Sequence, residues 1–582
     1  MTFFRKLNGI FNKKTKIKIA ILIFGIITGA IIETGALAII GPFISVAMDS
    51  SIVETNEILR YVYNLLGFES TDAFLAFLAF LLAFVYVFKG VYIFTLNRLK
   101  YRFVSRQQIA LSHRIMEIIM AKPYIYHVNR NIAEIKRTIQ KDVAELIRLM
   151  TIVLSLASDM FMSTFIFILL FSTSVPLSLG VIFLSTLCIA IYFKIFRKKI
   201  RDMGKENREK YLQMSKTVNQ SIGSIKELKV LRREGYFLDA FEKNSKRFAK
   251  TNRQFNVYDK IPKLMIESIC FGGAFVLVGS MILGGADIGY LVPQLSLFVL
   301  AAFRLLPAVA RFAGYVNKII FYRPSVDAVY NNLQEGKEEE VKKAFPNPME
   351  TGGVQNRVAK DIVIKNVTFQ YPNTKEPVLD NVSFTIPARK SVAFIGPTGA
   401  GKTTLADIIL GIYEPDKGQV LYDGKSIHHD LVWGSNLGYI PQQIYLLDES
   451  ITANIAFGIP EDEIDINKVK SVLEKVQMSK FVESLPDKLD TVVGDRGARL
   501  SGGQRQRIGI ARALYSDPDI LVMDEATSAL DNETEKAVME AIERFKGSIT
   551  MIIIAHRLTT IENCDIICRV DNKSITIEKD NR

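Results

Sequence analysis

Cysteine is scarce in this chain of 582 residues, which has only four: Cys188, Cys270, Cys564 and Cys568. Two of them lie in apolar runs, and the pair near the C-terminus has no second pair of metal ligands close to it in the sequence. The sequence therefore predicts neither a disulfide framework nor a zinc site. Such sparse cysteine is consistent with a reducing compartment for the C-terminal half.

A cleavage site of small residues is also missing after the basic N-terminus and the apolar run that follows it. That run is longer than the apolar region of a secretory signal peptide, so we interpret it as a retained membrane span. Hydrophobic residues make up 49% of the chain, and the mean hydropathy of +0.19 is high for a soluble protein. The length predicts several domains.

Six apolar stretches in the first half approach the length of about 20 residues that a helix needs to cross a bilayer. They run approximately over residues 19–48, 73–96, 150–172, 176–196, 264–283 and 290–310. The third and fourth stretches, and likewise the fifth and sixth, are separated by a few residues typical of tight hairpins. We therefore predict an α-helical membrane domain over residues 1–333, with six transmembrane helices.

Basic residues are almost absent from one side of these predicted spans. The loop 49–72 carries only Arg60 and the two hairpins carry none, whereas the N-terminal tail, 98–145 and 197–263 are rich in Lys and Arg. The positive side faces the cytoplasm, which predicts a multi-pass protein with both termini cytoplasmic. The same residues explain much of the net charge of +13, so we expect no nucleic-acid partner.

The two long basic segments contain few helix breakers, and we expect them to extend the spans as helices into the cytoplasm. Turns at their tips are predicted near 122–127 and 229–236; the alternative is a pair of solvated loops. On the opposite side, Ile58, Val62, Leu65 and Leu66 recur at helical spacing. They predict a short amphipathic helix at about 54–66, or ordinary packing onto the spans.

Composition changes between residues 334 and 360, where glutamates, Pro346, Pro348 and two glycines indicate a solvated linker. Beyond it, short strands alternate with helices. The clearest strands are 362–369, 391–395, 520–523 and 550–554. This alternation predicts an α/β domain over 361–582 with a largely parallel sheet.

A phosphate-binding loop lies between one of these strands and a helix. The pattern G-x-x-x-x-G-K-[ST] runs through Gly396, Pro397, Thr398, Gly399, Ala400, Gly401, Lys402 and Thr403, with Thr404 next. Its glycines let backbone N–H groups point at phosphate oxygens, its lysine supplies a positive charge, and the hydroxyl of Thr403 can bind Mg²⁺. The loop predicts a P-loop nucleotide-binding domain that uses ATP and Mg²⁺.

Two carboxylates follow the strand 520–523. Asp524 is predicted to help hold Mg²⁺, and Glu525 to activate the water that attacks the γ-phosphate. A helix cap is the alternative for such an acidic pair. His556 follows the strand 550–554, at the end of the sheet where α/β proteins bind ligands, and we expect it to contact the γ-phosphate.

A second phosphate cradle is predicted where Ser501, Gly502, Gly503 and Gln504 precede a helix at about 505–515. One domain already has its phosphate loop, so this cradle requires a second phosphate. Two copies facing head to tail supply it, each cradle closing on the ATP of the partner. We therefore predict a homodimer.

The phosphate loop and the later Leu-Ser-Gly-Gly-Gln segment, in this order, resemble those of an ATP-binding cassette ATPase. Together with the six predicted spans, they make the whole chain resemble an exporter-type half-transporter. The resemblance implies that Tyr371 stacks on adenine. It also implies that Gln442 senses Mg²⁺ and the membrane domain, although Gln443 follows directly. Residues 494–497 resemble a loop that touches the cytoplasmic extensions, and 528–531 one that contacts the partner. Alternating access is the implied mechanism.

Charged residues within the spans are costly and usually line a cavity or an interface. Lys89, Lys263, Arg304 and Arg311 are our candidates for a cavity that takes an anionic headgroup; alternatively, Lys89 and Lys263 pair with Glu33 and Glu267 or extend to the membrane surface. Segments at 32–34, 41–45, 298–307 and 326–333 resemble the flippases of lipid-linked oligosaccharides in bacterial protein N-glycosylation. That resemblance implies a bacterial cytoplasmic (inner) membrane protein that flips a polyprenyl-diphosphate-linked oligosaccharide.

Three other functions compete with this one. The first is ATP-driven export of another amphiphile: a lipid, a drug or a peptide, although a peptide-processing exporter usually carries a protease domain before the first span. The second is a soluble cassette protein acting on nucleic acid or ribosomes, which is expected to have two cassettes and no spans. The third is a membrane-anchored ATPase without transport, which does not need charges within its spans.

Overall fold

A computed structural model describes residues 3–580 except 49, 174, 284–287, 337–358, 373, 431–432, 526–534, 536–538, 541 and 556–560. It divides into two compact units. Met1–Lys122 and Arg130–Val341 form the first, which we call the helical unit. Pro123–Asn129 and Lys342–Arg582 form the second, the α/β unit. Most of the predicted linker lies outside the described residues.

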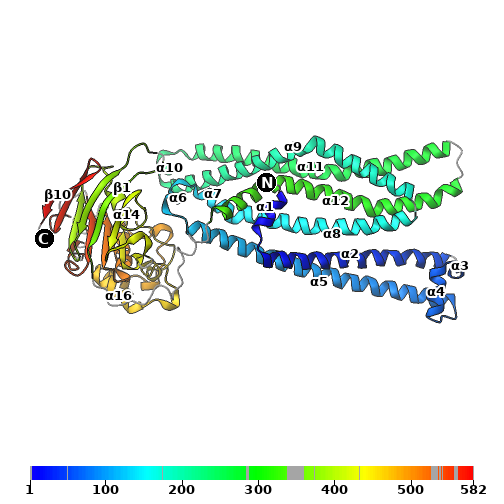
Figure 1. The fold of residues 1–582 in the computed structure, drawn as a ribbon, viewed down its shortest axis with the longest axis horizontal. Helices are drawn as coiled ribbons and strands as arrows, with labels where there is room; N and C mark the ends of the chain where they lie inside the picture. The colour runs from blue at the N-terminus through cyan, green and yellow to red at the C-terminus, as the bar shows by residue number, and fades with distance from the viewer. Residues whose placement is uncertain are drawn as a thin grey trace. The chain divides into compact units, whose positions relative to one another are not determined.

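Among the described residues of the helical unit, six long helices run side by side (Figure 1). Two of them, α5 and α11, contain 50 residues each. At 1.5 Å per residue each is about 75 Å long, more than twice the thickness of a bilayer's hydrocarbon core. The prediction that the basic segments are helical is confirmed. The six are α2 (Lys13–Met48), α5 (Thr71–Met120), α8 (Val143–Thr173), α9 (Val175–Gly223), α11 (Glu234–Leu283) and α12 (Ile288–Glu335).

Short helices join the long ones. The predicted turn at 229–236 is present: α10 (Ile225–Leu231) is capped by Arg232, whose φ of 51° reverses the chain before α11. The other predicted turn is occupied by a short helix, α6 (Tyr124–Asn129). The remaining short elements are α1 (Phe3–Ile10), α3 (Ile52–Thr55), α7 (Ile132–Arg137) and a π-helical turn η1 (Thr138–Asp142).

The predicted helix between the first two spans is α4 (Glu57–Leu65). Asn56 caps it, since its side chain accepts hydrogen bonds from the backbone N–H groups of Ile58 and Leu59. Leu59 is buried and Val62 packs against the same small apolar cluster, but the Ile58 side chain is 75% exposed. One face of the helix therefore packs onto the spans, and another apolar face is open.

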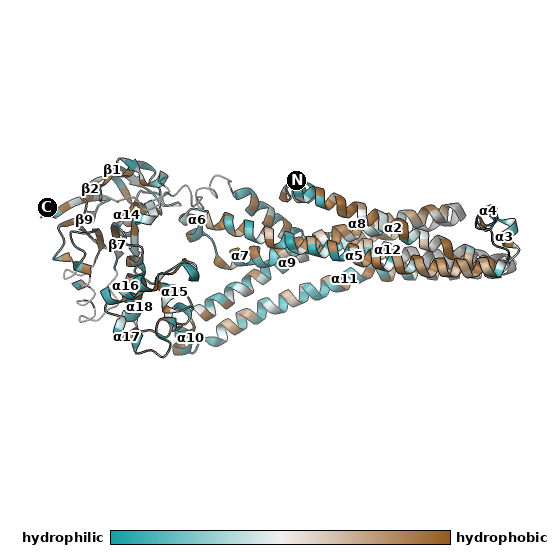
Figure 2. Ribbon diagram, turned by 90° about the horizontal axis from the view of Figure 1, so that it is seen from below, coloured by the Kyte–Doolittle hydropathy of each residue, from teal (hydrophilic) through white to brown (hydrophobic). Residues whose placement is uncertain are grey.

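Apolar residues are concentrated in the half of the bundle that carries α3 and α4, and polar residues toward the other end (Figure 2). Among the described residues, three segments are long and apolar enough to cross a membrane: Lys13–Ala36, Thr71–Met120 and Ile132–Phe165. Helices α9 and α12 approach each other closely at Gly204, where a Cβ atom would lie 2.1 Å from the carbonyl oxygen of Phe321. Only glycine allows this approach.

The described strands of the α/β unit form two sheets. The larger has the order β10-β9-β3-β8-β7-β6 and is parallel except for its edge strand β10. The smaller is antiparallel, with the order β2-β1-β4-β5. The strands are β1 (Ile362–Phe369), β2 (Leu379–Ile386), β3 (Ser391–Ile395), β4 (Lys417–Tyr422), β5 (Lys425–Ser426), β6 (Leu437–Ile440), β7 (Ile520–Asp524), β8 (Thr550–Ile554), β9 (Ile566–Asp571) and β10 (Ser574–Asp580).

The expectation of one largely parallel sheet is thus correct for the larger sheet and wrong for β1. Strand β1 pairs antiparallel with both β2 and β4. Its residues alternate between buried and more exposed, as in a sheet packed on one face only. Strands β7 and β8 are instead buried at every residue, which is typical of a parallel sheet covered on both sides.

Alternate residues of β3 enter two separate hydrophobic clusters. Val392 and Phe394 pack with helix α14 (Lys402–Ile409), and Ala393 packs in the cluster of the helices on the opposite face. These helices are α15 (Ile451–Ile455), α16 (Ile466–Lys475), α17 (Ser479–Glu483) and α18 (Gly502–Tyr515). The sheet therefore separates α14 from α18.

Candidate ATP-hydrolysis site

The phosphate loop connects β3 to α14. Gly396 has a φ of 142°, and a Cβ atom there would lie 2.1 Å from the carbonyl oxygen of Val570. Gly401 has a φ of 102° and caps α14. The amino group of Lys402 donates hydrogen bonds to the carbonyl oxygens of Gly396 (2.9 Å) and Pro397 (3.0 Å). The lysine thus lies across its own loop, with its charge at the N-terminal end of α14.

Acidic residues stand at the carboxyl end of the parallel sheet. Asp524 ends β7 and is 7% exposed. The next residue, Glu525, has a φ of 46° and donates its backbone N–H to the carbonyl oxygen of Ile554 on β8 (3.0 Å). From the loop after β6, the amide nitrogen of Gln442 lies 2.7 Å from a carboxylate oxygen of Glu525. The structure therefore brings together two of the predicted catalytic residues.

Burial and charge act on the ionisable groups of this site. Burial lowers the pKa of Lys402, while the carboxylates of Glu525 and Asp524 act to raise it. Burial, with a smaller contribution from the charge of Asp524, raises the pKa of Asp407 on α14 to about 6. Thr403, Gln442 and Asp524 carry a hydroxyl, an amide and a carboxylate oxygen, and oxygen ligands of these types would suit Mg²⁺.

The predicted adenine-stacking residue, Tyr371, lies beside the phosphate loop. Its hydroxyl is 2.9 Å from the hydroxyl of Thr404. Its ring packs edge-on against Phe369 and Tyr413. Tyr413 also contacts Tyr124 of α6, with 5.8 Å between ring centroids. Helix α6 thus belongs to the same compact unit as the nucleotide site.

Ser501 caps α18 in a reciprocal arrangement. The Ser501 hydroxyl accepts from the backbone N–H of Gln504 (3.2 Å), and the Gln504 side-chain oxygen accepts from the backbone N–H of Ser501 (2.8 Å). The predicted helix therefore begins at Gly502. Helix α18 lies beside α16, and α14 lies beside β7 (Figure 2). The two predicted phosphate cradles are anchored in different hydrophobic clusters.

Some predicted residues lie outside the described part of the chain. They are His556 and the segment 528–531. The segment 494–497 is described and forms a short turn in which Arg496 has a φ of 52°.

Sequence reasoning missed the residue that organises the loop after Gln442. Asn454 is fully buried. Its side-chain oxygen accepts from the backbone N–H of Leu447 (2.8 Å) and from the guanidinium of Arg512 (3.1 Å). Its amide nitrogen donates to the carbonyl oxygens of Leu447 (3.0 Å) and Ser450 (3.1 Å). A single asparagine four residues after Ser450 carries no recognisable signal of this role.

Three of the four predicted cavity cations contact carboxylates in the helical unit. Lys89 lies 2.8 Å from Glu33, and Lys263 lies 3.7 Å from Glu267. Arg311 makes a two-pronged contact with Asp159, at 2.7 and 3.2 Å. The side chain of the fourth, Arg304, lies outside the described part of the chain. The side chain of Lys89 is 15% exposed, whereas those of Arg311 and Lys263 are 43% and 58% exposed.

A bundle of six long helices with a P-loop ATPase of this form defines an ATP-driven membrane transporter. The family described as "ABC transporter transmembrane region" matches residues 19–313, and the family described as "ABC transporter" matches residues 379–528. The chain belongs to the ABC transporters and is an exporter-type half-transporter. It binds ATP and couples its hydrolysis to transport.

Two relatives illustrate the similarity. An ATP-dependent lipid A-core flippase of Cupriavidus pinatubonensis is 27% identical over 483 residues, 82% of this chain and 80% of that protein. One of Pseudoalteromonas translucida is 42% identical over 242 residues, 41% of this chain and 40% of that protein. A solved bacterial Atm1-family ABC exporter with ATP bound has a TM-score of 0.71 at 22% identity, covering 98% of this chain and 96% of that one. This last similarity concerns the fold alone.

Proposed function

We propose that this transporter flips a polyprenyl-diphosphate-linked oligosaccharide, or a similar lipid-linked glycan, across a bacterial cytoplasmic membrane. The observation that carries the proposal is the ion pair between Arg311 on α12 and Asp159 on α8, two helices that we assign to spans. A guanidinium held in this two-pronged way and 43% exposed is placed to take a phosphate. The relatives are named for ATP-dependent flipping of another lipid, lipid A-core.

The paired cations divide into two roles in this proposal. Lys89 is mostly buried against Glu33 and joins α5 to α2, so it positions these helices. Lys263 and Arg311 are more exposed and reach the headgroup. A diphosphate carries more charge than one carboxylate and displaces Glu267 and Asp159 from them. Arg304, on α12 with Arg311, completes the set.

Hydrolysis of ATP uses the residues that the sequence predicts for it. Glu525 accepts the proton of the attacking water, and His556 contacts the γ-phosphate. Thr403, Gln442 and Asp524 would hold Mg²⁺, which would supply positive charge against the phosphates. Tyr371 stacks on adenine. Backbone N–H groups of 396–404 bind the phosphates of one ATP.

Two copies of the chain complete each site. The separation of α14 and α18 by the sheet supports a cradle, Ser501 to Gln504, that serves the partner's ATP. A mixture of Lys402→Met chains with Ser501→Arg chains tests this. In mixed dimers one composite site has both defects and the other has none, so nucleotide trapping returns. If each chain instead forms a complete ATP site by itself, mixing the two variants does not restore nucleotide trapping.

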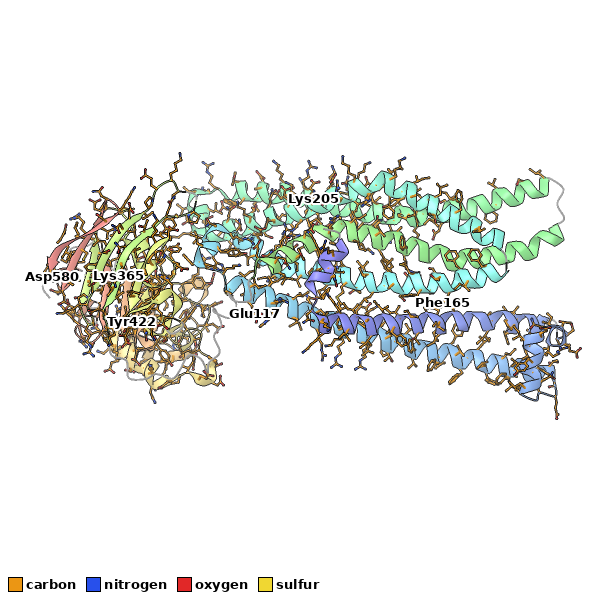
Figure 3. The ribbon with its side chains drawn as sticks, in the orientation of Figure 1. Glu117, Phe165, Lys205, Lys365, Tyr422 and Asp580 are labelled. Carbon is orange, nitrogen blue, oxygen red and sulfur yellow. The ribbon has the colours of Figure 1, made fainter. Side chains whose placement is uncertain are left out.

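Vesicles test the substrate. Purified chain is reconstituted with a fluorescent polyprenyl-diphosphate glycan, and translocation is scored by protection from a glycan-modifying enzyme. Arg311→Ala is expected to lower ATP-dependent translocation by about tenfold or more while ATP hydrolysis continues, since a charged hydrogen bond to phosphate is worth about 1.5–3 kcal/mol. Lys205→Gln on α9 is the matched control; Lys205 is exposed (Figure 3). Equal translocation by Arg311→Ala and Lys205→Gln overturns the assignment.

A second candidate, favoured by the names of the relatives, is a phosphorylated glycolipid without a polyprenyl chain. The same vesicles distinguish it. Translocation of such a glycolipid, with none of the polyprenyl-diphosphate glycan, selects the second candidate. In both cases we place both termini in the cytoplasm, on the side of the basic segments.

A further inference from the structure

A second set of basic side chains lines a cavity in the helical unit. The cavity has a volume of about 910 Å³ and lies among α8, α9 and α12. Its lining includes five cations: Lys194, Arg197, Lys198, Arg201 and Arg323. None of the described lining residues is acidic. The cavity is distinct from the cations that we assign to the transported headgroup.

The neutralisation of these cations is incomplete. Arg201 lies 3.6 Å from its neighbour Asp202, and Arg323 lies 4.0 Å from Asp327. Within the described part of the chain, no ion pair or hydrogen bond involves the side chains of Lys194, Arg197 or Lys198. Several like charges around one hollow repel one another unless an anion lies between them.

Apolar and basic lining residues are ordered along the helices. On α9 the lining passes from Ala190 and Phe193 to Arg197 and Arg201, a rise of about 17 Å. On α12 it passes from Phe312 and Val316 to Arg323 in the same direction. This end of both helices is where the basic segments begin, the side that we place in the cytoplasm. An acyl chain along the apolar part puts an attached phosphate among the cations.

We propose that this cavity binds the phosphate headgroup of an anionic phospholipid of the cytoplasmic leaflet. Charge complementarity favours this occupant over a second copy of the chain, because a second copy brings the same cations to the same place. Arginine and lysine together suit a phosphate diester, arginine through its fork and lysine as a point charge. This proposal does not depend on which lipid is transported, because binding to this cavity is measured without transport.

Native mass spectrometry of the full chain in detergent tests the site. Phosphatidylglycerol is expected to bind about tenfold more tightly than phosphatidylcholine with the same acyl chains. The triple variant Lys194→Gln, Arg197→Gln and Lys198→Gln is expected to lose this preference. Arg323→Gln, on a different helix, is expected to weaken it and keeps the test decisive if the triple variant does not fold.

A matched triple variant removes three charges from the same helix outside the cavity: Lys199→Gln, Lys205→Gln and Lys216→Gln. It is expected to keep the preference. Equal binding of the two lipids, or equal losses in the two triple variants, overturns the proposal. Displacement of the lipid by soluble glycerol 3-phosphate at equal concentration also overturns the proposal, because the apolar lining then contributes nothing to the affinity. If dimers dissociate in the triple variant of Lys194, Arg197 and Lys198 but not in the matched triple variant, the proposal is overturned as well. The cavity is then an interface between copies of the chain.

Discussion

The side-chain amide of Gln442 donates a hydrogen bond of 2.7 Å to the carboxylate of Glu525. One residue follows β6 and the other follows β7, which are neighbouring parallel strands. The contact links the loop held by Asn454 to the proposed general base. While this hydrogen bond is made, one carboxylate oxygen of Glu525 is engaged by Gln442, and Gln442 would also supply an oxygen ligand for Mg²⁺.

Glu525→Gln is expected to lower the rate of ATP hydrolysis by about 10²- to 10⁴-fold, because an amide cannot accept the proton of the attacking water. The affinity for ATP is expected to stay within about threefold, since the amide keeps the size of the side chain. Phosphate release and fluorescent ATP binding measure the two effects. Glu474→Gln, an exposed residue of α16, is the control. Normal turnover in Glu525→Gln refutes the assignment.

Replacement of Tyr371 separates stacking from hydrogen bonding. Tyr371→Phe removes only the hydroxyl contact with Thr404 and is expected to leave ATP affinity nearly unchanged. Tyr371→Ala removes the ring, and since base stacking is worth about 1–3 kcal/mol, it is expected to weaken ATP binding about 5- to 150-fold. Titration calorimetry measures both variants. Equal affinities of the Phe and Ala variants contradict a stacking role.

Asn454→Ala is expected to destabilise the α/β unit by about 2–4 kcal/mol, because it leaves the Leu447 N–H and part of Arg512 without a partner in a buried place. The chain's single tryptophan, Trp433, is 3% exposed in this unit, so its fluorescence reports the unfolding of the unit. Asn467→Ala, at an exposed position of α16, is expected to stay within about 0.5 kcal/mol. Similar unfolding midpoints for both variants argue against the role of Asn454.

Stability is expected to depend on pH through Asp407. Burial raises the pKa of this carboxyl from its ordinary value of 3.8 to about 6 in the folded chain. The folded state therefore favours the protonated form, and the stability of the unit decreases as pH rises from about 4 to about 6 and then levels off. Asp407→Asn removes this penalty. The variant is expected to unfold at a higher temperature than the parent at pH 8.

Tryptophan fluorescence recorded from pH 4 to pH 8 checks this expectation. The difference in unfolding temperature between Asp407→Asn and the parent is expected to narrow as pH falls toward 4. A constant difference across this range means that Asp407 does not change its protonation on folding. Asp416→Asn, whose carboxylate accepts from the backbone N–H of Gln370 (2.7 Å), is expected to destabilise the unit instead.

Local sequence patterns predicted much of the α/β unit because its features lie within short segments. The bounds of β1, β3 and β8 coincide with the expected strands, and the phosphate loop lies between β3 and α14. The partners of β1 were not predictable in this way. Strands β2 and β4 lie on either side of it in space but follow β1 along the chain, and periodicity says nothing of pairing direction.

The ion pairs and hydrogen bonds that the sequence did not predict join residues that are far apart along the chain. Lys263 and Glu267 are one helical turn apart, so their pairing was foreseeable. Arg311 and Asp159 are 152 positions apart, and only the packing of α8 against α12 brings them together. Likewise, the contact with Glu525 distinguishes Gln442 from its neighbour Gln443.

We propose that ATP hydrolysis at Glu525 drives a lipid-linked glycan across the membrane. The most direct measurement is the rate of translocation of a polyprenyl-diphosphate glycan in vesicles, with the parent and with Glu525→Gln. The parent with ATP and Mg²⁺ is expected to translocate the glycan in repeated turnovers, and Glu525→Gln is expected to show no net translocation. Equal rates with and without ATP, or equal rates for the parent and Glu525→Gln, contradict the claim.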